Sequence, residues 1–186
     1  MTEKVKVLLV EDTLTQALIL KRILESKASY SVTIAASAEK ALELVYSSDD
    51  NKFDFVLADV NLPEMDGYDL VKAIRTNPAT AGMTVVLLAS LINREDILQI
   101  IECGADNFLY KTYDDEYLLR RLSDIIASVL MRKSGEKKEA CKWKGVFGKR
   151  ISIASIETDR AVDMLLSSFD TNVQQKRVAS KVTQNQ

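Results

Sequence analysis

The chain has 186 residues, of which 47% are hydrophobic and 28% charged, as in globular domains that bury a core of ordinary size. It contains no histidine, which excludes a Ser-His-Asp triad, histidine-ligated zinc and a phosphohistidine on this chain. Residues 1–131 contain 21 acidic and 13 basic side chains, a formal charge of −8, whereas residues 132–186 contain 6 and 12, a charge of +6. This asymmetry predicts two segments with different roles.

Short apolar runs and stretches with helical spacing alternate along the first two thirds of the chain. In chain order they predict a strand at 5–10, a helix at 14–24, a strand at 31–35, a helix at 38–47, a strand at 53–60, a helix at 69–76, a strand at 84–89, a helix at 95–103, a strand at 107–110 and a helix at 114–131. Ser37 is a predicted helix cap, and Gly104 is the glycine expected just after a helix.

The predicted strands are nearly all apolar, which is typical of a parallel sheet covered by helices on both faces. Right-handed crossovers then favour an α/β fold with a doubly wound, five-stranded parallel sheet. In such sheets, ligands bind beyond the carboxyl ends of the strands, where the strand order reverses. The residues that follow the strands are therefore the candidates for chemistry.

Polar side chains follow four of the five predicted strands, and we expect them to meet at one edge of the sheet. They are Glu11 and Asp12 after the first strand, Asp59 and Asn61 at the third, Ser90 after the fourth and Lys111 after the fifth. Three neighbouring carboxylates repel one another unless a hard divalent cation such as Mg²⁺ compensates them. A lysine and a hydroxyl suit a phosphoryl group, which a carboxylate can accept as an aspartyl phosphate. The pattern predicts metal-assisted phosphoryl transfer onto an aspartate.

Four motifs carry a resemblance to a known family: VLLVED (7–12), DFVLADVNLPEMDG (54–67), VVLLAS (85–90) and ADNFLYK (105–111). Together they resemble the receiver domain of two-component response regulators over about residues 4–131. The resemblance implies a flavodoxin-like fold. It also implies a phosphoryl group donated by a sensor histidine kinase or a phosphotransfer protein.

The resemblance also implies a role for each site residue. Asp59 would be the phosphoacceptor, Lys111 and Ser90 would contact phosphoryl oxygens, and Phe108 would be the switch aromatic that turns inward as Ser90 moves. Mg²⁺ would be bound by Asp12, by Asp59, by the backbone carbonyl of Asn61, and by Glu11 through a water. Such a protein catalyses its own phosphorylation, with no separate substrate, so whether it counts as an enzyme is a matter of definition.

Two positions depart from the family pattern. Thr112 replaces the proline that usually follows the lysine, often on a cis bond, so we expect a different path before the last helix. Leu91 replaces a small residue after the switch hydroxyl and, with Ile92, predicts slow dephosphorylation. Two alternatives remain open: a scaffold module of the same fold that never turns over phosphate, and a small flavodoxin-like enzyme or cofactor carrier. The enzyme is disfavoured because no glycine-rich loop follows the first strand.

The last third of the chain has a different character. Residues 132–145 are expected to be a basic linker, and 146–186 a short β-hairpin and a helical connector rather than an independent output domain. Two β-like runs lie within 142–154, and a helix is expected from Thr158 with an apolar stripe at Val162, Leu165, Leu166, Phe169 and Val173. Part of this segment resembles the connector of receiver–histidine kinase fusions. This resemblance suggests that the chain is either a fragment of such a fusion protein or a relative that lost its output domain.

Partners and location follow from the same features. Nucleic acid is disfavoured as a partner because no helix-turn-helix pair follows the receiver. A homodimer is expected, through the C-terminal helix or through the face near Phe108. No apolar run approaches the ~20 residues of a membrane span, and the N-terminus lacks a signal peptide. With Cys103 and Cys141 interpreted as reduced thiols, we expect a cytoplasmic protein.

Overall fold

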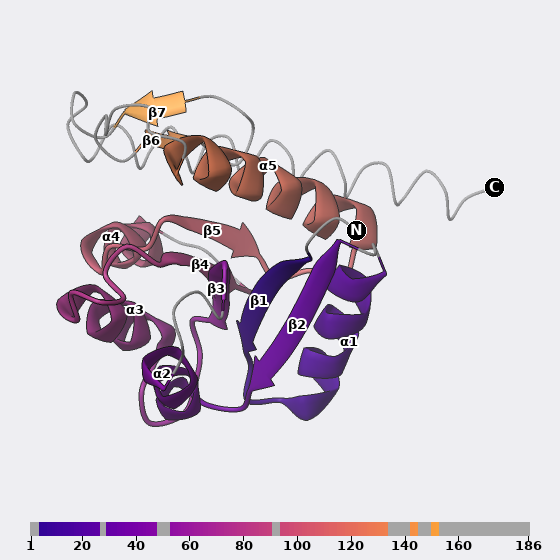
Figure 1. The fold of residues 1–186 in the computed structure, drawn as a ribbon, viewed down its shortest axis with the longest axis horizontal. Coiled ribbons are helices and arrows are strands. Elements are labelled where there is room, and N and C mark those ends of the chain that lie inside the picture. The colour runs from indigo at the N-terminus through magenta and orange to yellow at the C-terminus, as the bar shows by residue number, and fades with distance from the viewer. Residues whose placement is uncertain are drawn as a thin grey trace. The chain divides into compact units, whose positions relative to one another are not determined.

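The computed structural model describes residues 4–26, 29–47, 53–90, 94–133, 142–144 and 150–152. Strands and helices alternate through the first 133 residues (Figure 1). In chain order the elements are β1 (Val5–Val10), α1 (Leu14–Glu25), β2 (Tyr30–Ala35), α2 (Ala38–Tyr46), β3 (Phe55–Asp59), α3 (Gly67–Thr76), β4 (Thr84–Ala89), α4 (Arg94–Glu102), β5 (Asn107–Tyr110), α5 (Asp115–Lys133), β6 (Lys142–Lys144) and β7 (Arg150–Ser152). The chain divides into two compact units, Met1–Ile92 with Gln99–Glu136, and Asn93–Leu98 with Lys137–Gln186.

The first five strands form one sheet in the order β2-β1-β3-β4-β5, and all four neighbouring pairs are parallel. This confirms the predicted doubly wound, five-stranded fold. The chain moves outward in one direction from β1 to β2 and in the other from β3 to β5. The strand order therefore reverses between β1 and β3, which is where ligands bind in sheets of this kind.

The centre of the sheet is buried: every residue of β3 and β4 is buried, as are the last four of β1. On one face, Leu9, Leu57 and Leu88 from three strands pack into a core cluster with Leu20 of α1 and Leu118 of α5. Helices α2 and α3 lie on the opposite side of the sheet from α1 (Figure 1). A sheet covered on both faces leaves only its edges and the strand ends for polar chemistry.

The element boundaries follow local capping. The side-chain hydroxyl of Ser37 accepts a hydrogen bond from the backbone N–H of Lys40 at 3.2 Å, which confirms the predicted cap of α2. Helix α3 begins at Gly67, earlier than the predicted start at Asp69, because Asp66 accepts from the N–H of Asp69 at 2.8 Å and so caps the helix. Gly104 has φ +82°, the left-handed conformation expected after a helix.

Arg75, in the last turn of α3, ties together the loops at the amino ends of β4 and β5. Its guanidinium donates to the carbonyl oxygens of Gly104 at 2.9 Å, Ala81 at 3.1 Å and Met83 at 2.6 Å, and pairs with the Asp106 carboxylate at 2.7 Å. Asp106 in turn accepts from the N–H of Val85 at 2.9 Å, the second residue of β4. This network lies at the opposite end of the strands from the predicted site.

Strands β6 and β7 form a short antiparallel pair in which Trp143 lies opposite Ile151. They coincide with the two β-like runs predicted in the tail, and β6 falls inside the range expected to be linker. The helix expected from Thr158 and its apolar stripe lie outside the described residues. Within the described part of the chain, no helix is long and apolar enough to cross a membrane.

Candidate functional site

The backbone of the sheet places three acidic residues next to one another at the strand-order reversal. Val10 of β1 pairs with Ala58 of β3, so the next residue of each strand, Glu11 and Asp59, lies at the same edge. The N–H of Glu11 donates to the carbonyl of Ala35 at 3.0 Å, which extends the sheet hydrogen bonding one residue past β1. The juxtaposition predicted for the first and third strand ends is therefore present.

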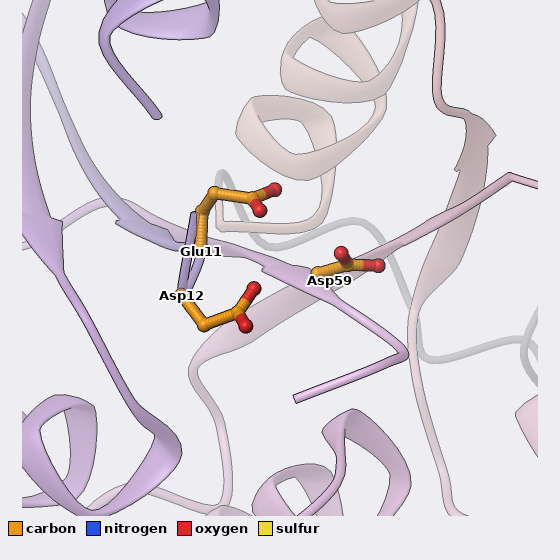
Figure 2. A group of neighbouring side chains, drawn as sticks. All are labelled: Glu11, Asp12 and Asp59. Atoms are coloured by element: carbon orange, nitrogen blue, oxygen red, sulfur yellow. The ribbon is translucent and has the colours of Figure 1, made fainter. Parts of the chain in front are cut away.

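Glu11, Asp12 and Asp59 form a compact carboxylate cluster (Figure 2). One carboxylate oxygen from each residue lies within 4.8 Å of the other two. Glu11 and Asp59 are buried, at 1% and 4% exposure, whereas Asp12 is exposed. A small cation entering from the side of Asp12 could thus reach all three residues.

Lys111 compensates the two buried carboxylates. Its N–H donates to the carbonyl of Ala89 at 2.8 Å, which places the residue just past β5 beside the end of β4. Its ammonium lies 2.6 Å from Oδ2 of Asp59 and 2.6 Å from Oε2 of Glu11. Burial by itself would lower the pKa of Lys111, but the hydrogen bond to Asp59 and the ion pair with Glu11 outweigh it and raise that pKa. Lys111 is therefore a fixed positive charge inside the cluster.

Glu11 is held by its charge environment more than by hydrogen bonds. Its Oε1 accepts from the N–H of Thr13 at 3.3 Å, and its buried Oε2 makes an ion pair with Lys111 that is not a well-aligned hydrogen bond. Burial raises the pKa of Glu11, and Lys111 offsets part of that rise. A second cation near Oε2 would satisfy a carboxylate oxygen that the protein leaves poorly bonded.

The loop after β3 folds back on the strand end. The carbonyl of Val60 accepts from the N–H of Leu62 at 3.2 Å and from the N–H of Gly67 at 2.9 Å, so it closes the loop 61–66 at both ends. The N–H of Asn61 donates to Oδ1 of Asp59 at 3.3 Å. Glu64 has φ +62°, an uncommon conformation for a residue with a side chain. Asn61 is therefore beside Asp59, as predicted.

The remaining predicted residues have distinct environments. Ser90 directly follows β4 and is exposed, while Phe108 of β5 is 2% exposed, so its ring is already inside the protein. The hydroxyl of Thr112 accepts from the N–H of Asp114 at 3.2 Å and organises the turn into α5, and no cis peptide bond occurs in the described ranges. Leu91 and Ile92, on which the predicted slow dephosphorylation depends, lie outside the described residues.

Two contributions to the site were not predicted from the sequence. Thr13 donates its hydroxyl to Oδ1 of Asp12 at 3.3 Å as well as its N–H to Glu11, so it orients both acids after β1. Lys111 was expected only to face a phosphoryl group, but it also makes an ion pair with Glu11 and neutralises that carboxylate. The position of Thr13 directly after the acidic pair was a sequence signal for its role. Nothing local in the sequence indicates the pairing of Lys111 with Glu11.

The charges of the cluster suit a divalent cation. Three carboxylates and one ammonium leave a formal charge of −2, and the oxygen-only ligand set is the kind that Mg²⁺ prefers. An exposed acid at the rim gives such an ion a route to the buried ones. The residues present therefore fit a magnesium ion.

Known proteins resemble the chain over the same region. The family model of the response regulator receiver domain matches residues 7–123. The transcriptional regulatory protein RprY of Bacteroides fragilis is 30% identical over 136 residues, which are 73% of this chain and 55% of RprY. The "Probable chemotaxis protein CheY" of Rhizobium etli is 28% identical over 68% of this chain and 96% of its own length.

A solved structure agrees with these sequence relatives. The signal receiver domain of a signal transduction histidine kinase from Syntrophus aciditrophicus is 30% identical, with a TM-score of 0.59 over 73% of this chain and 96% of that one. This chain spans about half the length of RprY. The chain belongs to the response regulator receiver family, and residues 7–123 are its receiver domain.

Proposed function

We propose that this receiver accepts a phosphoryl group on Asp59, in a reaction that depends on Mg²⁺, from the phosphohistidine of a sensor histidine kinase or phosphotransfer protein. The observation that carries the proposal is the Lys111 ammonium, 2.6 Å from the Asp59 carboxylate inside a cluster of three acids. A lone strand-end aspartate would be an ordinary surface charge. An aspartate paired with a buried lysine and flanked by two more acids is a site suited to phosphoryl chemistry.

In the proposed step, a carboxylate oxygen of Asp59 attacks the phosphorus atom. A bond forms between that oxygen and phosphorus, the bond from phosphorus to the donor imidazole nitrogen breaks, and its electron pair remains on the imidazole. The product is a mixed anhydride on Asp59. Lys111, whose ammonium lies 2.6 Å from Oδ2 of Asp59, would contact an oxygen of the incoming group and compensate its negative charge.

The proposed magnesium ligands are Asp12, Asp59 and the backbone carbonyl of Asn61, with Glu11 acting through a water. When bound, Mg²⁺ would neutralise charge on the carboxylates and on the transferred group. Asp12 is exposed and can capture the ion, while Glu11 and Asp59 are buried and fixed by Lys111. The division between an exposed rim and a buried interior suits an ion that must enter and leave.

The start of α1 offers a surface for the donor protein. Leu14 and Leu18 lie one helical turn apart and are 67% and 53% exposed, on a helix that begins two residues after Asp12. Large apolar side chains exposed beside a charged site are typical of protein contacts. A phosphohistidine must come within bonding distance of Asp59, so we propose that the donor packs on this part of α1.

The proposed consequence of phosphorylation involves Ser90 and Phe108. Ser90 is exposed directly after β4, and we propose that its hydroxyl moves inward to contact a phosphoryl oxygen. Contacts made in one state alone shift the population toward that state. We propose that the surface near Phe108 changes as a result. We also propose that the chain forms a homodimer through that face or through the C-terminal helix, and that it is cytoplasmic.

The decisive experiment is formation of a Mg²⁺-dependent adduct. The chain is incubated with acetyl phosphate, or with beryllofluoride as a mimic, with Mg²⁺ or with EDTA, and the intact mass is measured. Asp59→Asn should abolish the adduct, whereas the control Asp69→Asn, on an exposed aspartate paired with Lys72, should retain it. Absence of an adduct in the unmodified chain would refute the proposal and favour a binding module that works without phosphorylation.

A further inference from the structure

The first residue of α3 packs directly against the backbone of Asp59. A Cβ atom built at Gly67 would collide with the carbonyl oxygen of Asp59, and it would lie 2.9 Å from Cα of Val60 and 3.1 Å from the carbonyl carbon of Asp59. All of these are backbone atoms, so no side-chain rotation can relieve the overlap. A residue larger than glycine therefore requires either the helix or the strand end to move.

The need for glycine at this position is one of space rather than of backbone conformation. Among the described residues, only Gly104 is a glycine with positive φ. Gly67 has a backbone conformation open to any residue, and its N–H donates to the carbonyl of Val60 at 2.9 Å. That hydrogen bond holds the helix start against the strand end. The missing side chain is what allows the two backbones to come so close.

We propose that Gly67 is a positioning residue for Asp59, a role whose catalytic consequence rests on the proposed function. Gly67 lies against the backbone carbonyl of Asp59 at the end of β3. The ammonium that pairs with the Asp59 carboxylate comes from Lys111, at the end of β5. A shift of the β3 end would move the carboxylate relative to the ammonium. Catalytic groups must be held within about 0.5 Å of their working positions, so a small displacement there reduces the rate.

The chain contains two matched controls. Gly104→Ala places a side chain at positive φ, where its nearest neighbours are the side-chain atoms of Arg75 from 3.6 Å, so it strains the protein away from Asp59. Gly82→Ala adds a methyl group with nothing within 4 Å. Comparing Gly67→Ala with both separates an effect on the site from a general loss of stability.

Two measurements on the full chain test the proposal. The first is the set of amide ¹H–¹⁵N chemical shifts of Asp59, Val60 and Asn61 without Mg²⁺. The second is the rate of phosphorylation by acetyl phosphate with Mg²⁺, at a temperature where every variant is folded. We expect Gly67→Ala to move these amides more than either control and to reduce the rate at least tenfold, while Gly104→Ala lowers Tm and leaves the rate unchanged.

The outcomes distinguish this inference from the proposed function. Unchanged amides and an unchanged rate in Gly67→Ala would overturn the inference, even if the unmodified chain is phosphorylated. If the unmodified chain accepts no phosphoryl group, the proposed function fails. The amide shifts alone then decide whether Gly67 positions Asp59. If Gly67→Ala does not fold, Asp66→Ala takes its place, because it releases the cap of α3. That variant should move the same amides, and no movement would overturn the inference.

Discussion

Replacing Lys111 by methionine would leave two buried carboxylates without their counter-charge. The side chains of Lys111, Glu11 and Asp59 are 7%, 0% and 6% exposed, so water can screen little of the resulting repulsion. Removing one member of a buried ion pair costs about 3–5 kcal/mol. We expect the free energy of unfolding to fall by about 3 kcal/mol, the lower end of this range, because Asp12 and the rim of the site are exposed and can relax.

The assay is urea unfolding followed by circular dichroism in EDTA, with Lys72→Met as the control. Lys72 makes an ion pair of similar length, 2.8 Å to Asp69, but the side chains of Lys72 and Asp69 are 60% and 56% exposed. Loss of this pair should therefore change the free energy of unfolding little. Adding Glu11→Gln to Lys111→Met should restore much of the stability, because it removes one uncompensated charge. Mg²⁺ should stabilise Lys111→Met more than the unmodified chain. A loss no larger than that of Lys72→Met would refute the reasoning from burial.

Three further outcomes are expected. Leu18→Asp should slow phosphoryl transfer from a phosphohistidine protein at least tenfold while the rate with acetyl phosphate stays the same, and equal slowing of both would argue against donor docking on α1. Arg75→Lys should lower the free energy of unfolding by about 2 kcal/mol in urea, because a lysine cannot reach all four acceptors, and a neutral result would contradict the role of this network. Burial raises the pKa of the Cys103 thiol, so maleimide should label it slowly at neutral pH in the folded chain, faster at higher pH and rapidly in urea; peptide mapping separates it from Cys141.

The predicted strands agree closely with the structure because burial on both faces leaves a local signal. The runs at 5–10, 84–89 and 107–110 coincide with β1, β4 and β5. The clearest case is β4, whose six residues are all buried, because a central parallel strand is covered on both faces. The run at 53–60 was too long by three residues, two before Phe55 and one after Asp59, because the buried apolar Phe53 and Val60 lie just outside the paired residues of β3. Helix starts were harder, and α3 began at Gly67 because Asp66 is a cap whose pairing depends on the loop before it.

The amino-acid sequence by itself determined which polar residues stand at the carboxyl ends of the strands. Parallel strands bring those ends to one edge, so the meeting of Glu11, Asp12, Asp59 and Lys111 was predictable without coordinates. Only the tertiary structure decided how these groups pair. Lys111 neutralises Glu11 as well as Asp59, and Gly67 lies against the carbonyl of Asp59. Such contacts depend on distances between atoms that only the folded chain brings together, and periodicity and spacing carry no information about those distances.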